Sequence, residues 1–363
     1  MTISTSSDLR EIKPQVDFNA VKRIIIRATN WVGDAILTTP AVRAVRKDFP
    51  DAEITMLAKP WVAPVFYNSP HVDHVFRYEA EGRHRGWLGK ARLVKALRKG
   101  KFDLAILFQN AFEAAMLTYL AGIPNRLGYD TDQRRFLLTH RIKMAPRLKQ
   151  IHEIDYYLGI LAAVGLKLDG RDLMLRLTER ERSRAREILR KQHITRGDTL
   201  VGVSPGATFG SAKRWPPERY GALCDKIYES HGVRIIIFGG PGEEATGRRV
   251  SEAMKHPTVN LCGKTTLRET AALIERCRLF VTNDSGLMHV AAALSVPLIA
   301  IFGSTNPITT GPSSVKSRVV RALVSCSPCL KPECPSDHKC MADISVDRVY
   351  AETDALLRQD SHC

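Results

Sequence analysis

The chain has 363 residues, of which 44% are hydrophobic and 25% are charged. This length predicts two domains, and the composition excludes a disordered chain, a collagen and a coiled coil. The longest apolar run, residues 287–303, is interrupted by His289, Ser295 and Pro297, so we expect no membrane-spanning helix. The first fifteen residues contain acidic side chains and no apolar core, which is unlike a secretory signal and predicts a cytoplasmic protein.

The net charge of +16 indicates an anionic partner, such as a phosphorylated substrate, a nucleic acid or an acidic membrane surface. The basic excess is concentrated in two clusters of the first half, residues 77–101 and 126–149. For any single lysine or arginine, a solvated surface position is the alternative interpretation.

Strand patterns alternate with helical patterns along the first half of the chain. Strands are predicted at residues 23–28, 53–58, 74–78 and 103–108, with helices at 35–46, 88–99 and 111–121. A mixed-charge helical segment between residues 166 and 195 predicts a domain boundary. The strand patterns then restart at 199–204, 233–238, 279–282 and 298–302.

This alternation predicts an α/β protein with two Rossmann-like, doubly wound domains that face a central cleft. We expect the first domain at residues 1–172 and the second at residues 173–363, the latter including a cysteine-rich segment and a C-terminal helix.

The first candidate site follows the first predicted strand, at residues 30–34 (NWVGD). Gly33 permits a close approach of the backbone, and Asp34 falls near the start of the next helix. One interpretation is that Asp34 only caps this helix. The other is that a carboxylate at the carboxyl end of a strand accepts a proton from an alcohol nucleophile.

A loop of small and hydroxylated residues follows the strand predicted at 199–204. It reads PGATFGSAKRWP over residues 205–216 and does not match the Walker phosphate loop. Its hydroxyls, its amides and Lys213 are suited to bind a phosphate group, and a plain surface loop is the alternative.

The third candidate is NDSGLMH at residues 283–289, between a predicted strand and an apolar helix. Asp284 and Ser285 would lie where the free amides of the helix start point at a ligand. His289 is either a half-buried structural histidine or a first-turn residue that faces the same pocket.

Residues 240–245 (GPGEEA) satisfy a variant of the dinucleotide-binding motif. Glu243 and Glu244 would place negative charge where a pyrophosphate should bind, and no acidic residue ends a second strand about twenty residues on. A hydride-transferring enzyme is therefore disfavoured.

Four of the eight cysteines fall close together, at Cys326, Cys329, Cys334 and Cys340. A cytoplasmic setting argues against disulfides. Four thiolates at this spacing can form a structural zinc site, but the span is shorter than two separated knuckles. Reduced structural thiols are the interpretation we adopt, with no metal in the active site.

Together these motifs resemble the ADP-heptose:lipopolysaccharide heptosyltransferases of glycosyltransferase family 9. The resemblance is carried by NWVGDAILTTPAVRAV at 30–45, PGATFGSAKRWP at 205–216 and VTNDSGLMHVAAAL at 281–294, in colinear order over nearly the whole chain. RLGYDTDQRRFLLT at 126–139 is a softer match. Within the family, the Trp-Val-Gly-Asp form of the first motif is most similar to the heptosyltransferase II type, which adds the second inner-core heptose.

The resemblance implies a GT-B fold with the acceptor on the first domain and the nucleotide sugar on the second. It implies an inverting transfer from ADP-L-glycero-D-manno-heptose to the inner-core heptose of lipopolysaccharide, with Asp34 as the general base and no required cofactor. The implied donor-binding residues are Thr208, Lys213, Glu243, Asp284, Ser285, Gly286 and His289. The acceptor-binding residues that we expect are Trp31, Arg126, Arg134 and Arg135.

The implied acceptor is a lipid A core with phosphates and acidic sugars, anchored in the inner leaflet of the cytoplasmic membrane. We therefore expect a cytoplasmic enzyme that is peripheral on the inner face of that membrane, and no nucleic-acid partner. The cluster at residues 77–101 would supply general attraction to the anionic surface.

Two alternatives remain open from the sequence. One is a glycosyltransferase of the same fold with another activated sugar. The other is a basic, zinc-bearing nucleic-acid-binding protein, against which stand the aromatic content of only 7% and the lack of an RNA-recognition or zinc-finger pattern.

Overall fold

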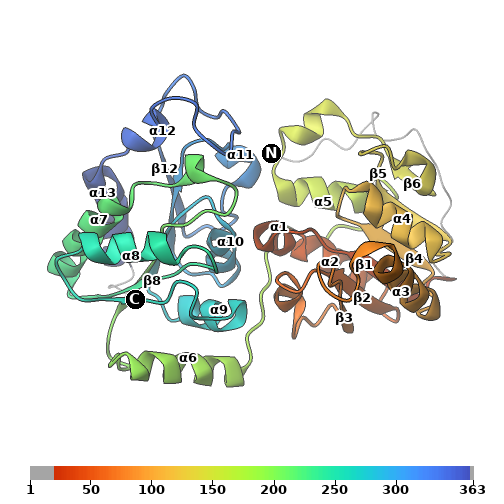
Figure 1. Ribbon diagram of the computed structural model, residues 1–363, viewed down its shortest axis with the longest axis horizontal. Helices are drawn as coiled ribbons and strands as arrows, with labels where there is room; N and C mark the ends of the chain where they lie inside the picture. The colour runs from red at the N-terminus through yellow and green to blue at the C-terminus, as the bar shows by residue number, and fades with distance from the viewer. Residues whose placement is uncertain (1–19, 360–363) are drawn as a thin grey trace. The chain divides into compact units, whose positions relative to one another are not determined.

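The computed structural model describes residues 20–359 and divides the chain into two compact units (Figure 1). The first, called unit 1, ends at Arg176, and the second, unit 2, begins at Leu177. The boundary expected from the sequence, between residues 172 and 173, lies slightly before this division.

Unit 1 is built on a six-stranded parallel sheet in the order β3-β2-β1-β4-β5-β6. The strands are β1 (Arg23–Arg27), β2 (Glu53–Ala58), β3 (His74–Arg77), β4 (Leu104–Leu107), β5 (Asn125–Tyr129) and β6 (His140–Ile142). The helices are α1 (Val32–Leu37), α2 (Thr39–Asp48), α3 (Gly86–Lys99), α4 (Phe112–Leu120) and α5 (Glu153–Ala162).

Unit 2 contains a second six-stranded parallel sheet, in the order β12-β11-β10-β7-β8-β9. The strands are β7 (Leu200–Ser204), β8 (Arg234–Ile237), β9 (Thr258–Asn260), β10 (Leu279–Asn283), β11 (Leu298–Phe302) and β12 (Ser317–Arg321). The helices are α6 (Glu179–Lys191), α7 (Pro217–His231), α8 (Glu244–Ala253), α9 (Leu267–Glu275), α10 (Gly286–Ala293), α11 (Pro307–Thr310), α12 (Lys339–Ala342) and α13 (Val346–Gln359).

The two sheets have the same strand order when each is counted from its own first strand. In both, the order reverses beside that strand: between β1 and β4 in unit 1, and between β7 and β10 in unit 2. Ligands of doubly wound sheets bind at the carboxyl ends of the strands at this reversal point. The predicted fold class, α/β with two Rossmann-like units, is confirmed, and each reversal point is a candidate binding site.

The central strands form because their residues are apolar on both faces. Ile24, Ile25 and Ile26 of β1 are all buried, as is every residue of β4. Strands covered on both faces by helices require such continuous apolar runs, which is why they could be recognised in the sequence.

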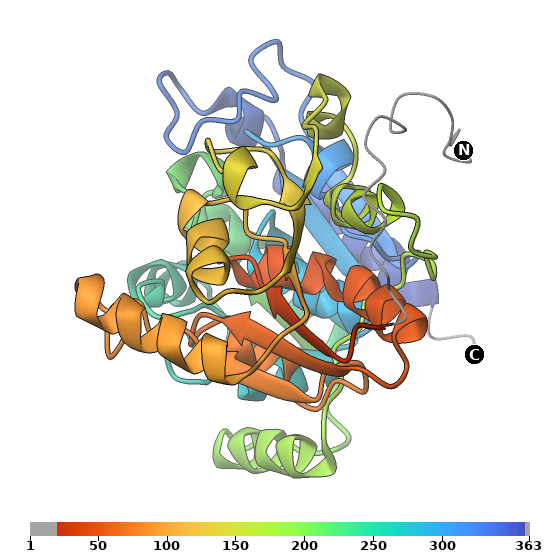
Figure 2. The same ribbon diagram turned by 90° about the vertical axis from the view of Figure 1, so that its right-hand side faces the viewer.

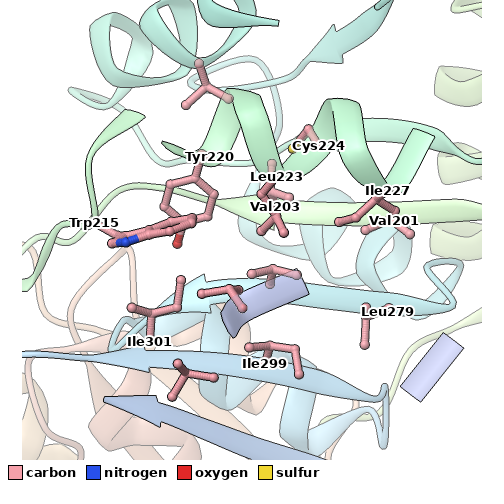
Figure 3. Close-up of a cluster of buried hydrophobic side chains, with 14 of the residues drawn as sticks. Val201, Val203, Trp215, Tyr220, Leu223, Cys224, Ile227, Leu279, Ile299 and Ile301 are labelled. Atoms are coloured by element: carbon pink, nitrogen blue, oxygen red, sulfur yellow. The ribbon is translucent and has the colours of Figure 1, made fainter. Parts of the chain in front are cut away.

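The core of unit 2 includes an aromatic pair that belongs to the loop and helix after β7 (Figure 3). Trp215 is completely buried, packs edge-on against Tyr220 at 5.1 Å between ring centroids, and donates from Nε1 to the carbonyl of Ile344 at 3.0 Å. Truncating a buried tryptophan costs about 3–5 kcal/mol, so Trp215 firmly fixes the end of the loop at residues 205–216.

Two features differ from the sequence expectations. The helix predicted at residues 35–46 is divided into α1 and α2 at Thr38, whose hydroxyl donates to the Ala35 carbonyl at 2.7 Å, and Pro40 in the first turn of α2 has no amide to donate. The strands β5, β6, β9 and β12 were not predicted. Within residues 20–359, no helix combines the length and the apolar character needed to cross a membrane.

Candidate active site

Asp34 lies after the carboxyl end of β1, in the first turn of α1, beside the reversal point of the unit 1 sheet. The N-cap of α1 is Trp31, whose side chain makes no capping hydrogen bond and is 55% exposed. Asp34 therefore does not occupy the capping position that the structural interpretation required. Its side chain is partly exposed.

The loop that leads to Asp34 is fixed by Arg27 and Trp61, which lie outside it. The buried Arg27 guanidinium donates to the Ala28 carbonyl and, at 2.9 Å, to Oδ1 of Asn30. Burial lowers the pKa of Arg27 to about 10, so the group is still charged at neutral pH. Trp61 donates from Nε1 to the Asn30 carbonyl at 2.9 Å. Both the side chain and the backbone of Asn30 are thus held, which defines the path of the chain just before Asp34.

Two residues of α5 interact with Asp34. Burial, and then the negative charge of Asp34, raise the pKa of Glu153 from 4.5 to about 7. The buried Tyr157 hydroxyl is hydrogen-bonded to Glu153, and burial, followed by the charges of both carboxylates, holds the pKa of Tyr157 well above its usual value. A like charge nearby disfavours ionisation of a carboxyl group. Unit 1 therefore places Asp34 beside a second carboxyl group, Glu153, whose own pKa is near neutral.

Glu153 and Tyr157 cannot be found from the motifs, because they lie far from Asp34 in the sequence. The signal that exists is weak: His152 caps α5 by accepting a hydrogen bond from the Ile154 amide at 3.2 Å, and an acidic residue follows the cap. Such an acidic residue is favourable at any helix start, so it does not indicate a site by itself.

The structure gives Arg134 a different place from the one expected for an acceptor contact. Its side chain is completely buried, and it donates from Nε to the Tyr129 carbonyl at 2.9 Å, from Nη2 to Oδ1 of Asn110 at 3.1 Å, and from Nη1 to the Gln109 carbonyl. Burial lowers the pKa of Arg134 to about 10. We therefore withdraw Arg134 as an acceptor contact, because its donors already join the segments that follow β4 and β5. The sequence shows its charge but not its burial.

Arg126 and Arg135 have different surroundings. Arg126 is half-buried, donates from Nε to the Leu137 carbonyl at 2.6 Å, and lies 5.3 Å from the ring centroid of Tyr119. Arg135 is exposed at the start of a short 3-10 turn. Contact of either residue, or of Trp31, with an acceptor stays a prediction, and Arg135 is the arginine best placed to make one.

In unit 2, the last residue of β10 fastens the loop that follows β7. Asn283 is completely buried and donates from Nδ2 to the Pro205 carbonyl at 2.7 Å. Its Oδ1 accepts hydrogen bonds from the Trp215 amide at 3.2 Å and from the Tyr220 hydroxyl at 3.1 Å. Both ends of the loop are therefore attached to the reversal point. Losing these buried bonds would leave polar groups unsatisfied, at about 1–3 kcal/mol each.

Lys213 and Asp284 form an ion pair between this loop and the end of β10. Lys213 Nζ lies 2.7 Å from Asp284 Oδ2, and the two side chains are only 13% and 5% exposed. Thr310 donates to the same carboxylate oxygen at 3.3 Å, and the ammonium lies 4.8 Å from the ring centroid of Phe209. A shielded ammonium beside the start of α10 is a suitable partner for a diphosphate.

Four more of the predicted donor residues lie on this loop or at the start of α10. Ser285 is the N-cap of α10, with its hydroxyl 3.1 Å from that of Thr282, and Gly286 is the first residue of the helix. His289 is buried in the first turn of α10, and Thr208 is exposed on the loop after β7. The structure thus gathers residues from two distant motifs at the carboxyl ends of β7 and β10.

Glu243 packs against the start of the loop after β7. Its carboxylate accepts a hydrogen bond from the Gly240 amide at 2.7 Å, and a Cβ added to Gly206 would lie 2.0 Å from its Oε1. Burial raises the pKa of Glu243. A side chain at position 206 would therefore displace the Glu243 carboxylate from its present place. The Gly240 amide, which a dinucleotide pyrophosphate would need, is already used by a carboxylate, in agreement with the interpretation against a hydride-transferring enzyme.

The cysteine-rich segment also contacts this loop. The Pro332 carbonyl accepts a hydrogen bond from the Ala212 amide at 3.0 Å. Burial, and then the charges of the other three thiols, raise the pKa of Cys340; those thiols belong to Cys326, Cys334 and Cys329. Within residues 20–359, no three histidine, cysteine or acidic side chains are arranged to hold a metal ion. The cysteine-rich segment therefore supports the loop at residues 205–216 through this hydrogen bond.

Two Rossmann-like units, with Asp34 beside Glu153 in one and the Lys213–Asp284 pair in the other, suit an enzyme that acts on a nucleotide sugar. Comparison with protein families supplies the class, glycosyltransferase, since residues 90–340 match the family described as glycosyltransferase family 9 (heptosyltransferase). The chain belongs to glycosyltransferase family 9.

Similar proteins extend over almost the whole chain. Lipopolysaccharide heptosyltransferase 2 of Escherichia coli K12 is 30% identical over 351 residues, which cover 93% of this chain and 99% of the relative. The solved structure of E. coli ADP-heptose LPS heptosyltransferase II has a TM-score of 0.79 at 29% identity, covering 93% of this chain and 99% of that one. A family 9 glycosyltransferase from Veillonella parvula has a TM-score of 0.85 at 27% identity, covering 95% and 99%. The resemblance read from the motifs is confirmed.

Proposed function

We propose that this protein transfers a heptose from an ADP-activated donor to the inner-core heptose of lipopolysaccharide, with inversion at the anomeric carbon. The observation that carries the proposal is the end-to-end similarity to relatives named lipopolysaccharide heptosyltransferase 2. The two reversal points support it, because each carries polar groups of the kind that one substrate needs.

In the proposed reaction, unit 1 binds the acceptor and Asp34 is the general base. An acceptor hydroxyl attacks the anomeric carbon as the bond from that carbon to the diphosphate oxygen breaks. The hydroxyl proton passes to the Asp34 carboxylate, and ADP leaves with the bonding electrons. Glu153 acts as a positioning residue: above about pH 7, where it is ionised, its negative charge favours proton uptake by Asp34.

Unit 2 would bind the donor and stabilise the departing ADP. Lys213 supplies a positive charge, Thr208 a hydroxyl, and the start of α10 at Ser285 and Gly286 supplies backbone amides. Asp284 holds the lysine ammonium in place. These groups are sufficient for a transfer that requires no divalent ion, which predicts that turnover persists in the presence of EDTA.

The lipid-linked acceptor places the proposed reaction at the inner face of the cytoplasmic membrane. The basic residues of unit 1 would then meet an anionic surface, where each nearby lysine or arginine contributes about 1 kcal/mol of attraction. Arg135 is the exposed arginine that we retain as an acceptor contact.

The test is a donor screen with the purified chain and a heptose-primed core oligosaccharide. We expect ADP release together with a product heavier by one heptose. The anomeric configuration of the new bond should be opposite to that of the donor. Retention of the anomeric configuration would contradict the single-displacement mechanism. Turnover with another activated sugar in place of ADP-heptose would favour the same-fold alternative.

The nucleic-acid alternative has its own test. A DNA-binding titration over a range of salt concentrations should show no tight complex, since we expect the charge of +16 to serve lipid-linked and phosphorylated substrates. Micromolar binding with a steep salt dependence and no sugar transfer would support that alternative instead.

A further inference from the structure

Helix α3 presents an exposed aromatic–aliphatic pair at its start and only positive charges along its length. Trp87 is 77% exposed and Leu88 is 54% exposed. The charged residues of the helix are Lys90, Arg92, Lys95, Arg98 and Lys99. Single exposed apolar side chains are common, whereas an apolar patch bordered by charged side chains is typical of an interaction surface, and Trp87 and Leu88 are bordered by basic side chains.

A groove of about 780 Å³ separates α3 from its neighbour α4, which lies beside it in both views (Figures 1 and 2). Its lining is apolar at Val94, Met116 and Leu120, and basic at Lys95 and Arg98. The apolar character extends onto the surface of α4, where Tyr119 and Leu120 are exposed. We call this groove and the exposed face of α3 the α3–α4 surface.

The α3–α4 surface is held together at both ends. Lys90 Nζ lies 3.4 Å from Oε1 of Glu113, and Arg98 donates from Nη2 to the Leu120 carbonyl at 2.7 Å. These contacts fix the spacing of the two helices, so the groove is a preformed part of unit 1.

A second groove on the molecule shows what distinguishes the α3–α4 surface. It measures about 370 Å³, lies beside α6 in unit 2, and is also lined by arginines and apolar residues. Helix α6, however, alternates its arginines with Glu179, Glu181 and Glu187, and its sequence contains no aromatic residue. Among the helices within residues 20–359, only α3 contains a tryptophan, and its charged residues are all positive.

We propose that the α3–α4 surface docks the protein onto an anionic lipid bilayer, with Trp87 and Leu88 entering the interfacial layer and the lysines and arginines facing the headgroups. Tryptophan is favoured at the membrane interface, and long basic side chains keep their charge among headgroups while their stems cover apolar surface. A nucleic acid would use the positive charges but would not account for an exposed leucine. A bilayer accounts for both.

This inference rests on the proposed function, in which the acceptor is anchored in a membrane, but its test needs no acceptor. The full chain is sedimented with vesicles of phosphatidylcholine alone and with vesicles in which about a third of the lipid is phosphatidylglycerol. We expect clear binding to the anionic vesicles, little binding to the neutral ones, and weakening at high salt.

Two double variants separate the apolar and the charged contributions. Trp87→Ala with Leu88→Ala, and Lys95→Glu with Lys99→Glu, should each weaken binding to anionic vesicles by about tenfold or more. The matched control reverses two exposed charges beside the α6 groove, Arg190→Glu with Arg196→Glu, and should bind nearly as well as the wild type. All these side chains are exposed or at the surface, so thermal unfolding and ADP affinity should be unchanged.

Several outcomes would overturn the inference. These are a wild type that does not bind anionic vesicles, a control that loses as much affinity as the charge variant, and an apolar variant that binds like the wild type. The last result would mean that the helix only attracts polyanions. If light scattering shows that the wild type is a dimer and that the Trp87→Ala, Leu88→Ala variant is a monomer, this surface binds a second copy of the chain instead.

The proposed function is measured separately, as heptose transfer to an acyl-free core oligosaccharide in the same preparations. Heptose transfer without vesicle binding would refute the docking proposal and support the proposed function. Vesicle binding that the variants weaken, without heptose transfer, would support the docking proposal and refute the proposed function.

Discussion

Replacing Glu153 with glutamine should stabilise the protein at alkaline pH and leave it unchanged at acidic pH. Between its usual pKa of 4.5 and its folded value of about 7, the folded protein keeps a proton on Glu153 that the unfolded chain has released. Stability therefore falls as the pH rises through this range, and the full cost is present above it. Glutamine cannot ionise, so it removes the cost, and it retains a polar partner for Tyr157.

The size of this effect follows from the displacement of about 2.5 pH units, which corresponds to a ceiling of about 3 kcal/mol. Glu153 is partly accessible to solvent, and screening reduces this figure, so we expect a gain of about 1–2 kcal/mol at about pH 8 and none below about pH 4.5. The assay is urea unfolding of the wild type and the variant at several pH values between these limits. Glu81→Gln, at an exposed position of the same unit, is the control.

The same substitution should change catalysis in a way that a structural role would not. Glu153 is ionised above about pH 7, and its negative charge then favours proton uptake by Asp34, so Glu153→Gln should lower kcat/KM above about pH 7 and leave it unchanged at more acidic pH. A stability difference that is independent of pH, or a kcat/KM that is equal in the variant and the wild type above about pH 7, would refute the coupling of the two carboxylates.

Three other substitutions test the loops and the donor site. Lys213→Ala should weaken ADP binding and slow turnover, by about 2.7–4 kcal/mol in the transition state. The same change leaves the buried Asp284 carboxylate without its cation and should lower the free energy of unfolding, and adding Asp284→Asn should restore that stability but not the ADP affinity. Arg134→Ala should lower the free energy of unfolding by about 3 kcal/mol or more with donor affinity unchanged, since its three acceptors lose their donor. Gly210→Ala would place a Cβ 2.0 Å from the Pro332 carbonyl, so it should shift the loop and reduce ADP affinity about tenfold or more.

Controls for these variants lie close by in the sequence. Arg135→Ala should cost little stability because the side chain is exposed, and Gly197→Ala should leave ADP affinity unchanged because the nearest atom to the added Cβ is 3.9 Å away. Calorimetric ADP affinity that is equal in Lys213→Ala and the wild type would remove Lys213 from the donor site. A stable Arg134→Ala protein would show that the buried guanidinium is dispensable.

The sequence predicts those parts of the fold whose signal is local. The apolar runs of β1, β4 and β7 are long enough to identify buried strands, and the alternation with helices identifies the parallel sheets. The strands β6 and β9 are only three residues long, and a run this short has no period to detect. Their existence depends on the neighbouring strand that they pair with.

The candidate site divides in the same way. Lys213 and Asp284 each stand in a recognisable motif, and the parallel topology then brings them together. Glu153 and Asn283 act through contacts with segments far away in the chain, so their roles appear only once the fold is known. For Arg134 the sequence misleads instead: its place in a basic cluster predicts a surface charge, but the fold buries the side chain.

The central claim, that Asp34 is the base of a heptose transfer, is tested most directly by Asp34→Asn. The variant and the wild type are compared for ADP-heptose affinity by calorimetry and for single-turnover transfer to a heptose-primed core. We predict that donor affinity is nearly unchanged, because Asp34 belongs to unit 1, and that transfer falls by about 10²-fold or more. Transfer at more than about a tenth of the wild-type rate, with the donor still bound, would contradict the assignment of Asp34 as the general base.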